Sequence, residues 1–305
     1  PCTCCCPGWS VAIRPPPMEI IVSSDERRGL WYVAIAVFFF STSPILIRWA
    51  TPLSPYVITC GRLAIGAIFV YLLAALQGLR PHWRREDVGR FALFGLITAL
   101  HFLCYIASLS FTTIAHSLAL TYTSPIFVTL FTRLFLKEPI ARRKYVGVVI
   151  TVVGMAVLTG FEPQFTTRMM IGDVLALGSA VAFGLYSVAG RSQRKRYPLF
   201  TYASGVYGIA ALWMLPLALM TYAPPPSLAG PALSILALGV LPLGLGHTLY
   251  NAALRRTHPT YVNLIATQEV TGGVILGVLL LGEVPSVQSL IGAAVMLAGI
   301  ALVLV

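Results

Sequence analysis

The chain has 305 residues, of which 57% are hydrophobic and 10% are charged, and its mean hydropathy is +0.84. About 25% of the residues in a soluble domain are charged, so this composition could not cover a soluble surface. The solvent for most of the chain must be lipid. The net charge of +11 would suggest nucleic acid in a soluble protein. The chain shows no surface module that combines basic and aromatic residues, so we expect no nucleic-acid partner. The positive charge instead indicates basic loops beside an anionic membrane leaflet.

The first 28 residues differ from the rest. They contain the triplet Pro15-Pro16-Pro17 and lack the apolar core of a signal peptide. Four cysteines crowd between Cys2 and Cys6 without the paired spacing of a zinc site, and no other cluster has metal-ligand spacing. We expect a disordered or non-native segment over residues 1–28, and neither a metal site nor a cofactor.

Apolar stretches near the bilayer-spanning length of about 20 residues follow one another along the remaining chain. Residues 89–136 are apolar for longer than one crossing needs, so they predict two helices with a tight turn near 110–113. Ser54 and Pro55 form a typical helix start. The predicted spans, ten in all, are 31–49, 55–77, two within 89–136, 144–160, 172–190, 199–222, 230–253, 258–281 and 286–305.

The basic residues of the loops test this count. If the N-terminus lies inside and the loops alternate, the outer side holds little beyond Arg48 and Arg168. Such a bias follows the positive-inside rule, and nine or eleven spans would scramble it. The pattern predicts a multi-pass protein of the bacterial inner membrane with both termini in the cytoplasm. The inner set is Arg27, Arg28, Arg80, Arg84, Arg85, Arg90, Lys137, Arg142, Arg143, Lys144, Arg191, Arg194, Lys195, Arg196, Arg255 and Arg256.

The chain also repeats itself at a constant offset. Matching pairs include Tyr105 and Tyr250, Leu136 and Leu281, Glu138 and Glu283, Gly147 and Gly292, and Gly154 and Gly299. The repeat predicts an all-α membrane protein with two five-helix halves, residues 29–162 and 171–305. Because five is odd, the halves must insert in opposite orientations, and inverted repeats are a signature of secondary transporters. A repeat that only builds a scaffold is the alternative.

With this layout, the chain resembles the ten-helix EamA-type exporters of the drug/metabolite transporter superfamily from residue 29 to the end. The motifs that carry the resemblance are Pro44 with Arg48, Arg62-Leu63, Pro125 with Leu136-Lys137-Glu138, Gly147 with Gly154, Glu269, Leu281-Gly282-Glu283, and Gly292 with Gly299. The resemblance implies a basket of helices around a central cavity. The first, third, fourth, sixth, eighth and ninth helices would line it, and the fifth and tenth would pack outside.

The resemblance further implies export of amino acids, other small metabolites or organic cations. Family members often have a proline after the carboxylate of the ninth helix. Here Val270 follows Glu269, so we expect a weaker kink at this point.

Polar side chains at membrane depth are expensive and point to function. Glu269 falls near the middle of its span, beside Gln268, and Asn263 and Thr267 share one helix face. One interpretation makes Glu269 a cation-binding or proton-coupling group with the other three as hydrogen-bond partners. The alternative is a glutamate that only locks helix contacts.

Aromatic and histidine side chains recur on the helices that would line the cavity. As a set they suit a pocket for amphipathic or cationic metabolites, although each one alone is more often a packing residue. The candidates are His101, Tyr105, Tyr122, Tyr186, His247, Tyr250 and Asn251, with His116 close to one helix start.

Arg62 lies about two turns into its span by the helical repeat. It could attract an anionic substrate group, but the position favours snorkelling or pairing with Glu283. Glu138 and Glu283 adjoin basic residues at helix ends and are interpreted as structural.

The sequence lacks a nucleotide-binding P-loop and the G-x-S-x-G and H-E-x-x-H motifs. We therefore predict no enzyme, but a gradient-driven or exchanging secondary transporter that exports small amphipathic metabolites by alternating access. A nucleotide-sugar or phosphorylated-metabolite antiporter is one alternative, and a non-transporting membrane scaffold or sensor is another. The expected partners are a small-molecule substrate and the lipid bilayer, and a homodimer is left open.

Overall fold

The computed structural model describes residues 23–111, 114–158, 166–281 and 286–304, and within these ranges every regular element is a helix. A 3₁₀ turn, η1 (Arg85–Asp87), and two π-helical segments, η2 (Thr132–Leu136) and η3 (Gly239–His247), join the α-helices. The α-helices are α1 (Ser24–Phe40), α2 (Ser43–Trp49), α3 (Pro55–Leu76), α4 (Val88–Phe111), α5 (Ile114–Thr121), α6 (Ser124–Phe131), α7 (Arg142–Leu158), α8 (Thr167–Ser192), α9 (Leu199–Thr221), α10 (Ala229–Leu238), α11 (Thr248–Leu254), α12 (Pro259–Ala266), α13 (Glu269–Leu281) and α14 (Val287–Leu304).

Among the described residues, six helical stretches are long and apolar enough to cross a membrane. They are Ser24–Trp49, Pro55–Leu76, Arg85–Phe111, Thr167–Ser192, Leu199–Thr221 and Ala229–Leu254. The other predicted spans coincide with helices that are shorter or interrupted, such as Ser124–Leu136 and Leu290–Leu304. The protein is therefore a multi-pass helical membrane protein, while the count of ten spans stays a prediction.

Two predicted boundaries can be compared with the helices. The predicted turn near 110–113 falls between α4 and α5, and residues 112–113 themselves lie outside the described part of the chain. Residues 1–22 of the expected disordered segment also lie outside it. Residues 24–28 form the first turn of α1, which the Ser23 side chain caps by accepting a hydrogen bond from the backbone N–H of Glu26. The expected disordered or non-native segment stays a prediction.

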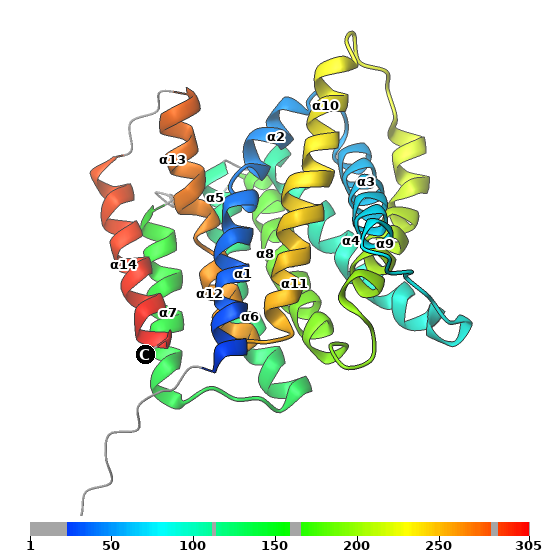
Figure 1. The fold of residues 1–305 in the computed structure, drawn as a ribbon. Coiled ribbons are helices and arrows are strands. Elements are labelled where there is room, and N and C mark those ends of the chain that lie inside the picture. Colours follow the sequence, from blue (N-terminus) through cyan, green and yellow to red (C-terminus); the bar gives the residue numbers. More distant parts are fainter. Residues whose placement is uncertain (1–22, 112–113, 159–165, 282–285, 305) are drawn as a thin grey trace, which may run out of the picture.

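The helices stand side by side as a bundle, and the described chain starts and finishes at the same end of it (Figure 1). α3 packs on α9, α4 packs on α8, and α1 packs on η3 and α11. α7 and α14 pack on each other at one edge of the bundle, as the resemblance implied for the fifth and tenth helices. Each of these main contacts joins a helix from one half of the chain to a helix from the other.

Glycines allow α7 and α14 to cross closely. An added Cβ at Gly154 would strike the backbone of Met296, and one at Gly299 would strike the backbone of Thr151. Likewise, a Cβ at Gly147 would meet Val303 and one at Gly292 would meet Leu158. Residues further along α7 contact residues earlier in α14, so the two helices are antiparallel. The contacts are also symmetric under the repeat offset of 145 residues. Gly154 and Met296 of one contact correspond to Gly299 and Thr151 of another.

Three helices are interrupted deep in the bundle, between α1 and α2, between α5 and α6, and between α12 and α13. The second break is at residues 122–123 and the third at 267–268, so these two occupy matching positions in the repeat. Each break contains a threonine whose hydroxyl donates to the carbonyl oxygen three residues earlier, in competition with the helix ladder. These bonds are Thr42 to Phe39 at 2.7 Å, Thr123 to Leu120 at 2.7 Å and Thr267 to Leu264 at 2.6 Å.

Proline contributes to two of the breaks. Pro44 and Pro125 are at the starts of α2 and α6, where a missing N–H costs nothing. The third break has Val270 at the corresponding position, yet the helix is still interrupted there. A break at this point therefore does not require proline, and the weaker kink stays a prediction.

The end of the bundle at which the described chain starts and finishes is called the basic end here. Acidic side chains of the first half pair there with arginines of the second, which holds the halves together. The pairs are Asp25 with Arg256 at 3.1 Å, Asp87 with Arg196 at 2.7 Å, and Glu138 with Arg191 at 3.0 Å and Arg194 at 3.4 Å. The interpretation of Glu138 as structural agrees with these contacts.

Candidate functional site

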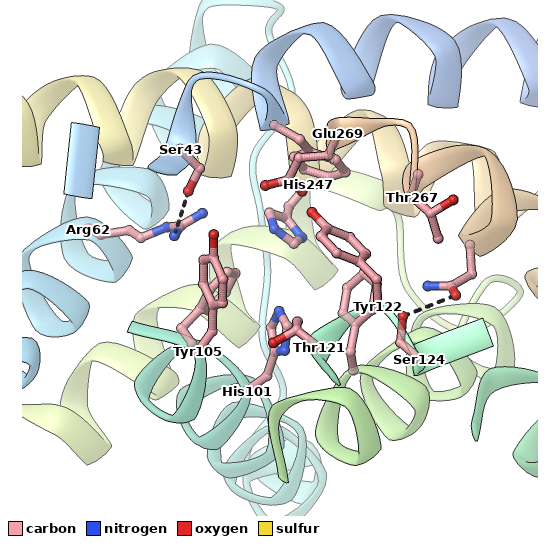
Figure 2. Close-up of a pocket in the computed structure, with 15 residues that line it drawn as sticks. Ser43, Arg62, His101, Tyr105, Thr121, Tyr122, Ser124, His247, Thr267 and Glu269 are labelled. Carbon is pink, nitrogen blue, oxygen red and sulfur yellow. Dashed lines mark hydrogen bonds between the residues drawn. The ribbon is translucent and has the colours of Figure 1, made fainter. Parts of the chain in front are cut away.

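A cavity lies in the middle of the bundle, where the three interruptions meet (Figure 2). Both halves of the chain line it. Its volume is about 40 Å³, and one water needs roughly 10–15 Å³ on this measure, so it has room for a few waters. The lining residues are Phe40, Ser43, Arg62, His101, Phe102, Tyr105, Thr121, Tyr122, Ser124, Phe183, His247, Asn263, Ala266, Thr267 and Glu269.

Arg62 is the charged residue that α3 contributes, and its surface is 2% exposed. One terminal nitrogen donates to the Ser43 hydroxyl at 3.5 Å, and the guanidinium carbon lies 4.3 Å from the centre of the Phe102 ring. The Nε atom has no hydrogen-bond partner. Arg62 makes no ion pair within 4.0 Å among the described residues.

Other polar atoms of the cavity wall also lack partners. The Tyr105 hydroxyl, the Thr121 hydroxyl and Nδ1 of His247 are buried and make no hydrogen bond. Buried polar groups in native proteins are nearly always paired with protein or water. A concave site with several convergent, unpaired polar groups is typical of a binding site for a small polar ligand.

Glu269 is the first residue of α13 and brings a carboxylate to the same cavity from the second half. The Tyr122 ring reaches toward it from the matching break in the first half (Figure 2). The Glu269 carbonyl oxygen accepts a hydrogen bond from the Ser41 hydroxyl at 3.4 Å. Gly272 makes this approach of α13 to the first break feasible, because an added Cβ would strike the Ser41 hydroxyl.

Aromatic rings form the part of the cavity wall between these polar groups. The His101 ring stacks on Phe183 at 4.6 Å, and its Nδ1 lies 3.0 Å from the Ser179 hydroxyl. The His247 ring lies 4.6 Å from Phe40 and 4.9 Å from Phe102. The cavity therefore combines apolar walls with a cation, a carboxylate and neutral hydrogen-bonding groups.

The structure brings together on the cavity wall seven of the predicted site residues: His101, Tyr105, Tyr122, His247, Asn263, Thr267 and Glu269. The remaining four, Tyr186, Tyr250, Asn251 and Gln268, do not line the cavity. The side chain of His116 lies outside what the structure describes.

Tyr186, Tyr250 and Asn251 form a buried hydrogen-bonded layer behind the wall. Asn251 donates to the Tyr186 hydroxyl at 2.5 Å and to the His247 carbonyl at 2.9 Å. The Tyr250 hydroxyl lies 2.8 Å from the Ser187 hydroxyl and 3.4 Å from the Asn263 amide nitrogen. These contacts orient the helices that carry His247 and Asn263, so the layer acts on the cavity through its neighbours.

Sequence reasoning missed Arg62 as a cavity residue. Its 2% exposure rules out snorkelling, and Glu283 lies outside the described residues, so that pairing stays a prediction. α3, the second span, therefore lines the cavity in addition to the helices that were expected to do so. Ser43, Thr121 and Ser124 were also missed, although the serines directly before Pro44 and Pro125 are a readable signal of a helix break.

A multi-pass helical bundle with two related halves and a polar cavity between them is the construction of a small-solute transporter. Two segments of the chain, residues 27–160 and 170–305, match the EamA-like transporter family. The chain belongs to this family. It is a transporter and not an enzyme.

Named relatives agree with this assignment. The pseudopaline exporter CntI of Pseudomonas aeruginosa is 28% identical over 87% of this chain and 92% of its own length. The threonine/homoserine exporter RhtA of Salmonella typhimurium is 26% identical over 74% of each chain. A solved crystal structure superposes with a TM-score of 0.78 over 90% of this chain and 95% of its own, at 19% identity, which supports the fold.

Proposed function

We propose that this protein is a secondary active transporter that exports small amphipathic metabolites, with amino acids as the first candidates, by alternating access. The observation that carries the proposal is the central cavity, in which unpaired polar atoms from both halves converge. Relatives that are named exporters support the direction of transport, and the threonine/homoserine exporter supports amino acids.

The proposal includes ten spans arranged as two inverted five-helix repeats. The antiparallel crossing of α7 and α14 supports it, because equivalent helices of inverted repeats run in opposite directions. The matching breaks at 122–123 and 267–268 support it as well, as does the location of both described ends at the basic end. By the positive-inside rule, the basic end would face the cytoplasm of a bacterial inner membrane.

The small size of the cavity supports a moving structure. Pockets for metabolite-sized ligands measure roughly 300–1,000 Å³, so the halves must separate before a substrate can enter. The ion pairs between the halves at the basic end would close the cytoplasmic side in this state. Opening that end would break them and admit substrate from the cytoplasm.

The two alternatives are less well supported. A phosphorylated or nucleotide-sugar substrate needs several cations, and Arg62 is the one Arg or Lys among the described cavity residues. A scaffold would pack its polar groups against helices and would not leave four cavity residues with unpaired atoms, namely Arg62, Tyr105, Thr121 and His247.

The test is transport by the purified protein in proteoliposomes. We expect counterflow of at least one solute from a panel of amino acids, including threonine and homoserine, and organic cations. Failure to move any of these solutes, with or without a pH gradient, would overturn the proposal.

Glu269 is proposed as the proton-coupling group because it brings a carboxylate to the cavity. Glu269→Gln removes the titratable proton while it keeps the size of the side chain. We expect accumulation driven by a pH gradient to be lost, while exchange at equal pH persists with a weaker apparent affinity because the carboxylate charge is gone. Glu86→Gln, at an exposed ion pair with Arg84, is the control and should behave as the wild type. Unchanged pH dependence in Glu269→Gln would remove the coupling role and leave transport standing.

A further inference from the structure

The central cavity holds one cation and one carboxylate that are not paired with each other. Arg62 enters from α3 in the first half and Glu269 from α13 in the second (Figure 2). No ion pair within 4.0 Å joins them. A buried ion pair would ordinarily close up, because each charge loses its hydration and needs a partner.

The surroundings of Arg62 leave most of its binding capacity unused. A guanidinium has five N–H donors in a fixed fork, and Arg62 uses one of them, on Ser43 at 3.5 Å. The Phe102 ring covers one face of the guanidinium at 4.3 Å. That contact offsets part of the lost hydration but satisfies no N–H group. The Nε atom stays buried and unpaired.

A carboxylate is the ligand group that this arrangement fits. Its two oxygens accept parallel hydrogen bonds from the guanidinium fork, in a short, charge-assisted pair. The unpaired Tyr105 hydroxyl, from the same cavity, can donate a further bond to such a group. A simple organic cation could meet Glu269 but would leave the buried Arg62 guanidinium without an anionic partner.

The other pole of the cavity selects the rest of the ligand. Glu269 would repel a second anionic group and attract a cationic one, and Tyr122 reaches toward the same place. Phe40, Phe102 and Phe183 supply apolar walls between the two poles. Together these groups fit a molecule that carries both a carboxylate and a protonated amine, with a small apolar or hydroxylated side chain.

We infer that Arg62 binds the carboxylate of a zwitterionic substrate whose amine lies at Glu269, so that the substrates are amino acids and related amino carboxylates. The inference rests on the proposed transport function and narrows it, because it excludes simple organic cations. Arg62 then acts as the specificity-determining residue for the anionic pole.

The test compares acids with their amides. Wild-type proteoliposomes are assayed by counterflow with L-threonine, L-leucine and L-phenylalanine, with the three carboxamides as competitors, and with tetraethylammonium. Hydrogen bonds to a charged group contribute enough to make the amides compete roughly 10-fold to 100-fold more weakly than the acids. Tetraethylammonium should not be carried.

Variants then assign this preference to Arg62. In Arg62→Gln we expect the acid and its amide to compete equally well for transport. Arg62→Lys should keep part of the preference for the acid, because lysine retains the charge without the fork of donors. Arg48→Gln changes an arginine that does not line the cavity and should keep the full preference. Size-exclusion profiles and melting temperatures show whether each variant is folded.

The outcomes separate the inference from the proposed function. Equally strong competition by acids and amides in the wild type, or transport of tetraethylammonium without any amino acid, overturns the inference and leaves transport intact. A folded Arg62→Gln that still prefers acids overturns the role of Arg62. If Arg62→Gln does not fold, the wild-type acid-to-amide ratio and Arg62→Lys still decide. A wild type that moves no solute overturns the proposed function itself.

Discussion

Glu138 shows how one side chain can join the two halves. It follows η2 and accepts hydrogen bonds from Arg191 at 3.0 Å and from Arg194 at 3.4 Å, while its carbonyl oxygen lies 2.8 Å from Nε2 of His258. Burial works to raise the pKa of the Glu138 carboxyl, but the hydrogen bond from Arg191 and the charges of Arg191, Arg194 and His258 together outweigh it, and the pKa lies below its ordinary value. The ionised form is therefore the one that the fold stabilises.

The pH dependence of stability follows from this direction. Because the folded pKa is depressed, the contribution of Glu138 is present above 4.5, the ordinary glutamate value, and is lost as the pH falls through the folded value. Glu138→Gln should lower the melting temperature at neutral pH, and its difference from the wild type should shrink as the pH falls below 4.5. Thermal unfolding in detergent measures this. The exposed Glu86→Gln should show no difference at either pH; a constant deficit for Glu138→Gln would contradict the argument.

At the scale of helices, small residues and hydroxyls position the cavity. The glycine crossing of α7 and α14 brings two backbones together at the edge of the bundle, as small-residue interfaces do in membranes. Hydroxyl-terminated breaks in three other helices then expose polar groups at mid-bundle. Non-helical backbone at this depth is tolerated only where it is buried in protein or lines a cavity.

Gly154→Val tests the crossing. The added side chain would strike the backbone of Met296, which cannot move as a side chain could. Overpacking of this kind costs roughly 1–3 kcal/mol, so the melting temperature should fall. Gly230→Val is the control, because nothing lies within 4 Å of an added Cβ there, and its stability should stay within about 0.5 kcal/mol. Equal melting of the two variants would show that the α7–α14 contact is looser than described.

At the scale of the molecule, the acidic side chains of the first half meet the arginines of the second at the basic end. Asp87 is the most buried of the three acids, with its side chain 3% exposed, and Arg196 binds it at 2.7 Å. In an alternating-access cycle these pairs must form when the basic end closes and separate when it opens. Their removal should shift the population of states toward an open basic end.

Asp87→Asn tests this shift. A cysteine is placed at Ser124, on the cavity wall, in a background with the native cysteines replaced by alanine. We expect a membrane-impermeant thiol reagent applied at the basic end to label this cysteine severalfold faster in Asp87→Asn than in the parent. Glu86→Gln, which breaks a pair within the first half only, should leave the rate unchanged. Equal labelling of all three proteins would show that Asp87 does not hold the basic end closed.

Much of the candidate site could be read from single positions, because polar groups are costly in a membrane and therefore conspicuous. Glu269, His101 and Tyr105 were found in this way. The same rule could not place Arg62, since the position of an arginine two turns into a span favours snorkelling or pairing over lining a cavity. It also could not tell the wall from the layer behind it, where the Asn251 amide donates to the Tyr186 hydroxyl.

The amino-acid sequence alone determined the solvent, the repeat and the family resemblance, because composition, hydropathy and constant offsets are properties of the chain taken in order. The tertiary structure decided which side chains share the cavity, that Arg62 and Glu269 face it without pairing with each other, and that ion pairs join the two halves at the basic end. These depend on the rotation of each helix about its axis. That rotation is set by contacts between distant segments, such as the glycine crossing and the three breaks, which no single stretch of sequence contains.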